Sequence, residues 1–274
     1  MKFGIRGHDI NTDSLEVLLQ RCEELNIKSV QLVLKKSVKG FKEGMFSPSY
    51  AAEIGRQFKE KGIEISILGC YINPSNTNVE QLQKDMKFFV ECLKYAKFMN
   101  AGMVALETGF VGDSCDPERN DTEQAYQYLF KNMKYLCDAA EKLGVMIGIE
   151  GVHVYVINSI KKMRRLVDDL NSPNVCVVFD PYNLINLKNY KNPRALIDEA
   201  FEVLGDEMAA IHLKDFVFEN GDLRYTSPGT GDIDAKYIMT KANEFKPNLP
   251  IILENVKEGD FAMVAQNLEK IMQN

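Results

Sequence analysis

The sequence predicts an α/β protein built as a single (β/α)8 barrel, or TIM barrel, that spans residues 1–274 as one domain. Short apolar runs alternate along the whole chain with longer segments whose apolar residues recur at helical spacing. Eight such units in 274 residues match the size of this barrel, about 250 residues. The rival fold, an open doubly wound sheet, lacks its usual Gly-x-Gly-x-x-Gly after the first strand.

Each expected strand is an apolar run bounded by a turn or by a charged residue. The strands are expected at 2–6, 29–34 and 63–68 and in the runs that end near Glu107, Glu150, Asp180, Leu213 and Glu254. Helices are expected from about Leu15 and over 51–61, 79–99, 122–143, 158–170, 195–204 and 235–244, with a last helix that carries Phe261, Val264, Leu268 and Ile271. Gly62 and Gly144 follow two of these helices, where glycine commonly ends a helix. The segments 35–50, 108–121 and 215–232 are expected to be long loops.

Composition and charge argue against several classes of protein. The formal net charge is −6 and no basic cluster is interleaved with aromatic residues, so we expect no nucleic-acid partner. The start of the sequence lacks the apolar core of a secretory signal, and no apolar stretch approaches the roughly 20 residues that cross a bilayer. The six cysteines include no Cys-x-x-Cys pair, which is typical of reduced, structural cysteines. We therefore expect a cytoplasmic protein with no membrane partner.

Five of the apolar runs deliver an ionisable side chain at the C-terminal end of the strand. These residues are Glu107, Glu150, Asp180, His212 and Glu254. Barrel enzymes carry their active sites at the C-terminal ends of the strands, so the five side chains are expected to converge on one rim. Crowded carboxylates repel one another, and a divalent cation removes that repulsion. Carboxylates with one imidazole suit Mn²⁺, with Mg²⁺ or Co²⁺ as alternatives, better than a structural zinc.

Several short segments are similar to those of one known family. They are Ile149-Glu150, Phe179-Asp180-Pro181-Tyr182-Asn183, Ile211-His212-Leu213-Lys214-Asp215, Pro228-Gly229-Thr230-Gly231-Asp232-Ile233-Asp234 and Leu253-Glu254-Asn255. In order and spacing they resemble the xylose isomerase-like TIM barrel superfamily, in its sugar phosphate isomerase/epimerase branch. The resemblance covers essentially the whole chain, and it implies a metal-dependent isomerase or epimerase that acts on a carbohydrate and uses one divalent ion.

The resemblance also implies roles for individual residues. The metal ligands would be Glu150, Asp180, His212 and Glu254, and the two glutamates would also be the catalytic residues that move the substrate proton. A metal chelated by a carbonyl and a neighbouring hydroxyl stabilises the enediolate that forms when the adjacent carbon loses its proton. Return of a proton to the opposite face gives an epimer, and return to the neighbouring carbon gives an isomer.

Two positions depart from the ketose 3-epimerases of that branch. Those enzymes have a histidine three residues after the metal-binding aspartate and an arginine six residues after the metal-binding histidine. This chain has Asn183 and Phe218 at those positions. The metal site therefore carries over, whereas the 3-epimerase specificity does not. A dehydratase or lyase that acts on a keto-polyol such as an inosose through the same enediolate remains an alternative.

Five further residues are candidates for contacts with the substrate. They are His8, Glu107, His153, Asn183 and Lys214. His8 follows the first strand, with an exposed turn histidine as its alternative, and Glu107 has loop anchoring as its alternative. His153 is a candidate substrate contact or second base. Lys214 would neutralise an enolate or a phosphate, and its alternative is an ion pair with Asp215.

Two other classes of protein share the predicted barrel. An apurinic endonuclease binds three zinc ions through many histidines, but this chain has three histidines in all and Asn183 at a zinc-binding position. A non-catalytic sugar-binding barrel would not need a metal set. We therefore expect a small-molecule carbohydrate substrate, and a homodimer or homotetramer as the assembly.

The segments 108–121 and 215–232 are expected to cover the site, and the turn 229–231 is either a phosphate cradle or, more commonly, only a turn.

Overall fold

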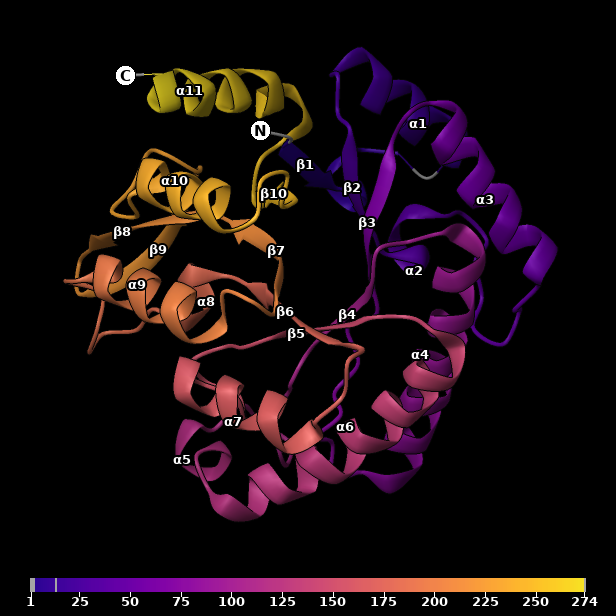
Figure 1. The fold of residues 1–274 in the computed structure, drawn as a ribbon, viewed down its shortest axis with the longest axis horizontal. Coiled ribbons are helices and arrows are strands. Elements are labelled where there is room, and N and C mark those ends of the chain that lie inside the picture. The colour runs from indigo at the N-terminus through magenta and orange to yellow at the C-terminus, as the bar shows by residue number, and fades with distance from the viewer. Residues whose placement is uncertain (1–2, 13, 274) are drawn as a thin grey trace.

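A computed structural model describes residues 3–12 and 14–273 of the chain. Its strands are β1 (Phe3–Arg6), β2 (Ser29–Leu32), β3 (Glu64–Gly69), β4 (Val104–Glu107), β5 (Ile147–Glu150), β6 (Val175–Phe179), β7 (Met208–Leu213), β8 (Asp215–Glu219), β9 (Asp222–Thr226) and β10 (Ile251–Leu253). Within the described residues, eight of them form a closed parallel barrel in the order β1-β10-β7-β6-β5-β4-β3-β2. Figure 1 shows the helices arranged as a ring around these strands. The predicted (β/α)8 barrel is confirmed.

Helices connect the successive strands of the barrel. They are α1 (Leu15–Glu24), α2 (Leu34–Ser37), α3 (Pro48–Glu60), α4 (Val79–Met99), α5 (Pro117–Asn120), α6 (Glu123–Leu143), α7 (Ile160–Leu170), α8 (Pro181–Leu184), α9 (Pro193–Leu204), α10 (Ala235–Phe245) and α11 (Phe261–Gln273). Ser14, Thr122 and Ser159 each accept a hydrogen bond from a backbone N–H in the first turn of the following helix. Gly144 ends α6 with a φ of 68°, as its position in the sequence predicts. Within the described residues, none of the helices combines the length and apolar character that crossing a membrane requires.

The first and last strands close the barrel. Residues 3–5 of β1 pair in parallel with residues 251–253 of β10. Figure 1 shows β1 and β10 next to each other, below the C-terminal helix α11. Gly4 permits the close packing at this seam, because a Cβ there would lie 2.6 Å from Cδ1 of Ile252 and 2.7 Å from the backbone oxygen of Ser29.

Two apolar clusters hold the barrel together. The larger one fills the space between the strands and the surrounding helices and includes Ile5, Leu106, Ile149 and Phe179. The smaller one contains the side chains that alternate with these along the strands, and it fills the barrel interior. Its buried members are Ile67, Met103, Ala105, Cys176, Val178, Ala210 and Ile252. The barrel is therefore solid below its C-terminal rim.

The predicted loop at 215–232 is wrong in part, because it contains an antiparallel hairpin. β8 pairs with β9 along their whole length, from Asp215 opposite Thr226 to Glu219 opposite Asp222. Asn220 and Gly221 form the turn, with φ values of 55° and 83°. Asn-Gly is the dipeptide that most strongly favours a two-residue hairpin turn, so the sequence did contain the signal.

Other boundaries also differ from the sequence prediction. The loops 35–50 and 108–121 contain the short helices α2 and α5. Helix α3 begins at Pro48, three residues before the predicted start, because Ser47 caps it and proline fits the first helical turn. The first strand is present as β1, and Lys2 of the predicted range 2–6 lies outside the described residues.

Candidate active site and metal centre

The C-terminal rim collects ionisable side chains because of the two-residue period of the strands. Four interior residues of the barrel are Ala105, Val178, Ala210 and Ile252. The residues two positions beyond them are Glu107, Asp180, His212 and Glu254. Glu150 ends β5 and pairs in register with Glu107. The same periodicity that packs the interior therefore turns all five groups toward the mouth of the barrel.

Three of the predicted metal ligands form a compact buried group. One ligand atom from each of Glu150, Asp180 and His212 lies within 4.8 Å of the other two. These residues are 2%, 1% and 0% exposed, and Nε2 of His212 has no hydrogen-bond partner. A divalent cation fits this donor set, because it would satisfy the buried nitrogen and offset the repulsion between the carboxylates.

Glu254, the fourth predicted ligand, lies beside this group and is surrounded by cations. Its Oε1 lies 3.2 Å from Nδ1 of His212, and its Oε2 lies 2.8 Å from Nζ of Lys214. Lys214 also lies 2.8 Å from Oδ2 of Asp180, and Arg6 donates to Glu254 at 3.5 Å. Although burial opposes ionisation, the charges of His212, Lys214 and Arg6 lower the pKa of Glu254 to about 2.

Asp215 does not pair with Lys214, so that alternative is wrong. Its carboxylate instead accepts hydrogen bonds from the backbone N–H groups of Phe216, Gly229, Gly231 and Ile233, at 2.8, 3.2, 2.8 and 2.9 Å. Gly231 permits this close approach, because a Cβ there would lie 2.1 Å from the backbone oxygen of Phe216. Asp215 thus anchors the base of the β8–β9 hairpin. Two backbone N–H groups of the turn 229–231 already donate to this carboxylate and are therefore not available to a phosphate. The turn has a structural role.

Burial and crowding shift the pKa values of three groups at the rim. Burial and the neighbouring Glu150 raise the pKa of Glu107 to about 7. Burial raises the pKa of Asp180 to about 6. Burial lowers the pKa of His212, but Glu150 and Glu254 outweigh it and raise the value to about 9. The rim therefore contains groups that exchange protons near neutral pH, as acid–base chemistry requires.

A cavity of about 290 Å³ opens at this rim. Its lining residues are Arg6, His8, Gln31, Lys36, Tyr71, Glu107, Glu150, Lys214 and Glu254. Asp180 and His212 are fully buried and do not belong to the lining. The volume lies at the small end of the range for ligand sites, about 300–1,000 Å³, which suits a small molecule.

The five predicted substrate contacts fall into two groups. The cavity lining includes His8, Glu107 and Lys214, but not His153 or Asn183. Asn183 donates from Nδ2 to Oε1 of Glu150 at 2.7 Å, and its backbone N–H donates to Asp180 at 3.0 Å. Its carbonyl accepts from the backbone N–H of His153 at 2.6 Å. Asn183 therefore orients two proposed metal ligands.

Four of the lining residues were not predicted from the sequence, namely Arg6, Gln31, Lys36 and Tyr71. Arg6 lies two positions after Gly4, and Gln31 is a polar residue within the apolar strand β2. The two-residue period of the strands would have predicted that both side chains point toward the barrel interior or its mouth. Lys36 lies in the short helix α2 and Tyr71 in the connection that follows β3, and the apolar pattern predicts the path of neither segment. Tyr71 accepts a hydrogen bond from Nε2 of Gln31.

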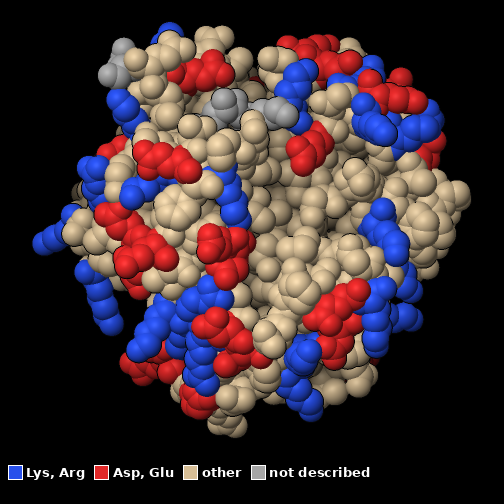
Figure 2. Space-filling model, viewed as in Figure 1, with Lys and Arg blue, Asp and Glu red and all other residues tan. Residues whose placement is uncertain are grey.

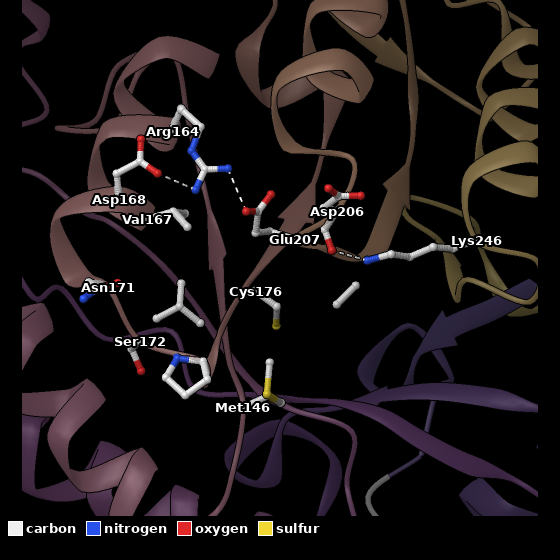
Figure 3. A pocket seen from close by; sticks show the side chains of 13 residues that line it. Met146, Arg164, Val167, Asp168, Asn171, Ser172, Cys176, Asp206, Glu207 and Lys246 are labelled. Carbon is white, nitrogen blue, oxygen red and sulfur yellow. Dashed lines mark hydrogen bonds and ion pairs between the residues drawn. The ribbon is translucent and has the colours of Figure 1, made fainter.

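A second cavity of about 690 Å³ lies at the opposite rim, near the N-terminal ends of β5, β6 and β7. Figure 3 shows Arg164 between Asp168 and Glu207, and Lys246 beside Asp206. Arg164 forms ion pairs of 2.7 Å with Asp168 and with Glu207. Lys246 donates to the backbone oxygens of Asp206 and Met208. This cavity contains none of the residues that sequence analysis singled out.

The closed barrel and the buried Glu–Asp–His group at its rim define a TIM barrel with a candidate metal centre. The family model of the xylose isomerase-like TIM barrel matches residues 19–273, so the chain belongs to this family. The resemblance inferred from short sequence segments is confirmed. A search of curated protein sequences finds no match.

Solved structures share this fold at low sequence identity. The apo form of 3-keto-D-glucoside 4-epimerase, YcjR, from E. coli is 13% identical with a TM-score of 0.75, over 98% of this chain and 99% of that one. IOLI protein with a bound zinc atom is 17% identical with a TM-score of 0.75, over 100% and 98%. The probable 3-DHS dehydratase AsbF from Bacillus anthracis is 13% identical with a TM-score of 0.77, over 98% and 99%. Such similarity shows the fold, which therefore occurs with an epimerase, a zinc-bound protein and a dehydratase.

Proposed function

We propose that the protein is a divalent-metal-dependent isomerase or epimerase of a sugar or sugar phosphate, and that it transfers a proton at a carbon next to a carbonyl. The observation that carries this proposal is the buried group of Glu150, Asp180 and His212, in which Nε2 of His212 has no partner. The family and the fold shared with an epimerase support it.

Glu150, Asp180 and His212 would hold the ion, with Glu254 as the fourth ligand. We propose Mn²⁺, with Mg²⁺ or Co²⁺ as alternatives, because the donors are mainly carboxylate oxygens. When bound, the ion supplies positive charge that polarises the substrate carbonyl and stabilises the negative charge that develops beside it.

Glu150 and Glu254 reach the cavity from two strands of the barrel. β5 and β10 are separated by β6 and β7, so the two carboxylates approach a substrate from different sides. In the proposed reaction one of the two groups, as a carboxylate, removes the proton next to the carbonyl, and the other, as a carboxylic acid protonated from solvent, returns a proton to the opposite face. The ammonium group of Lys214 lines the same cavity and offsets negative charge that builds up during the reaction.

A dehydratase that acts on a keto-polyol such as an inosose is the second candidate. It begins with the same removal of a proton, after which the hydroxyl on the neighbouring carbon leaves as water. That hydroxyl needs an acid to protonate it. Glu107 favours this candidate, because it lines the cavity with a pKa of about 7 and is partly protonated at neutral pH.

Incubation of the Mn²⁺-loaded protein with a panel of ketoses and inososes in D₂O tests the proposal. An epimerase or isomerase of this type should incorporate solvent deuterium at the carbon that exchanges its proton, which NMR detects. A dehydratase should instead give a product lighter by one water. Conversion without any solvent deuterium would indicate a hydride shift and contradict the two-carboxylate route. Elemental analysis that finds three zinc ions per chain would contradict the single metal centre.

A further inference from the structure

A groove on the outer surface lies between helices α4 and α6, away from the candidate metal centre. Its volume is about 550 Å³. Most of its lining belongs to these two helices, and the connection between α2 and α3 adds Gly44 and Phe46. Figure 1 shows α4 and α6 next to each other in the outer ring of helices. Among the described residues, the groove shares no lining residue with the cavity at the C-terminal rim, so the proposed function does not account for it.

The bottom of the groove is apolar. Leu82, Met86 and Val90 recur every four residues, which places them on one face of α4. Leu82 and Met86 are 8% exposed, so they lie beneath the more exposed residues of the lining. The lining residues of α4 extend from Leu82 to Lys94, a rise of about 18 Å at about 1.5 Å per residue. The groove is therefore long enough for an extended apolar chain.

One wall of the groove is held in place by packing and by a hydrogen bond. Phe46 packs edge-on against Tyr95, with ring centroids 4.9 Å apart, and contacts Phe98 at 6.0 Å. The backbone N–H of Gly44 donates to Oε2 of Glu91 at 2.9 Å. Glu91 is the one acidic residue among the described residues of the lining, and this bond uses it to tie the connection to α4. The wall is therefore a fixed part of the fold.

Three exposed lysines line the groove, namely Lys87 and Lys94 of α4 and Lys131 of α6. Lys94 lies over the ring of Phe46, with Nζ 5.8 Å from the ring centroid. None of the three forms an ion pair with a carboxylate of the described residues. Other lysines of the same helices do so: Lys84 pairs with Glu80 at 2.8 Å. Lys134 pairs with Asp138 at 2.7 Å.

The positive charge of the groove is local. The chain has a formal net charge of −6. Figure 2 shows acidic and basic side chains mixed over one face of the molecule, without a continuous basic area, so this face has no general attraction for anions. Three lysines against one glutamate give the groove an excess of positive charge beside its apolar bottom. This combination is complementary to a ligand with an apolar body and an anionic group.

We propose that the groove binds a medium-chain fatty acid, whose acyl chain lies along the apolar bottom and whose carboxylate is held by the lysines. Covering the apolar side chains removes them from water, and each ammonium group offers three donors to the carboxylate. The volume lies within the range of small-ligand sites, about 300–1,000 Å³. The length of the groove favours an extended chain over a compact ring, and a sugar would gain nothing from the apolar bottom. This site depends neither on the metal nor on the proposed reaction.

Calorimetric titration with sodium decanoate, below the concentration at which it forms micelles, tests the proposal. The affinity should be the same for the protein as purified and after treatment with EDTA, because no proposed metal ligand lines the groove. Butyrate has the same charge and should bind at least about a hundredfold more weakly, because it buries far fewer methylene groups. Decyltrimethylammonium has the same chain with the opposite charge and should bind at least about tenfold more weakly.

Two matched double variants locate the site. Lys87→Glu with Lys131→Glu reverses two charges in the groove and should weaken decanoate binding by more than about tenfold. Lys84→Glu with Lys134→Glu makes the same change in net charge on the same helices outside the lining, and should leave the affinity nearly unchanged. Circular dichroism checks the fold of both.

The inference is overturned if decanoate does not bind, if decyltrimethylammonium binds as tightly, or if the two double variants bind decanoate equally well. Loss of decanoate binding after EDTA treatment would also overturn it, because the carboxylate would then be a ligand of the metal. Failure of the proposed function would show separately, as missing metal or missing deuterium exchange, and would leave decanoate binding unaffected.

Discussion

The two rims of the barrel use polar side chains in different ways. At the N-terminal rim, Arg164 is paired with Asp168 and Glu207, and among the described residues lining that cavity only its Nε is a buried atom without a partner. At the C-terminal rim, Nε2 of His212 and Oε1 of Gln31 are buried side-chain atoms without a hydrogen-bond partner. The N-terminal rim thus pairs Arg164 within the chain, whereas the C-terminal rim leaves a potential metal-binding nitrogen without a partner. Buried polar atoms without partners therefore distinguish the rim with the candidate site better than cavity volume does.

The largest expected difference between the rims concerns metal binding. Asp180→Asn should remove most of the bound metal and lower activity by more than about a hundredfold, because it deletes a charged ligand from the buried group. The matched change at the other rim, Asp168→Asn, should leave metal content unchanged. Metal per chain is measured by elemental analysis after dialysis, and circular dichroism checks the fold. Equal metal content in the two variants would contradict the assignment of the centre.

A smaller difference should appear in the pH dependence of stability. In the metal-free protein the pKa of His212 is raised from 6.5 to about 9, so protonated His212 stabilises the fold below pH 6.5. This stabilisation is lost as the pH rises to about 9, and it amounts to about 3 kcal/mol. The melting temperature of the EDTA-treated protein should therefore fall between pH 6.5 and 9. A metal-free His212→Asn variant should lose this fall, and a flat profile in the unaltered protein would refute the explanation.

The smallest expected effect comes from the N-terminal rim. Arg164→Met removes two partly buried ion pairs and should lower the free energy of unfolding by about 1 kcal/mol, while kcat/KM and metal content remain unchanged. Urea denaturation measures the loss. Lys134→Met, which breaks an exposed pair with Asp138, is the control and should have almost no effect. A large loss of activity in Arg164→Met would mean that the two rims are coupled.

The sequence predicts the barrel and the position of the rim because both follow from a local period of two residues. A residue such as Glu254 can be assigned to the mouth from the apolar run that precedes it, without knowledge of its neighbours. The partners of Lys214 could not be assigned in this way. Lys214 contacts Asp180 and Glu254, which come from two other strands, so the contacts depend on barrel closure and strand register.

The contact between Gln31 and Tyr71 could not be predicted either. Gln31 is detectable as a polar residue in an apolar strand, but its bond to Tyr71 depends on the path of the chain after β3. The hairpin at 215–232 is a different case. Its Asn220-Gly221 turn and flanking aromatic residues are a local signal that sequence analysis could have used.

Because β1 pairs with β10, the barrel can close only after the last strand has been synthesised. Arg6 belongs to the first barrel strand, and Glu254, which it contacts at 3.5 Å, follows the last. A growing chain therefore lacks one candidate ligand and one wall of the cavity until almost the whole sequence has left the ribosome. Docking of the final strand therefore completes both the fold and the candidate site.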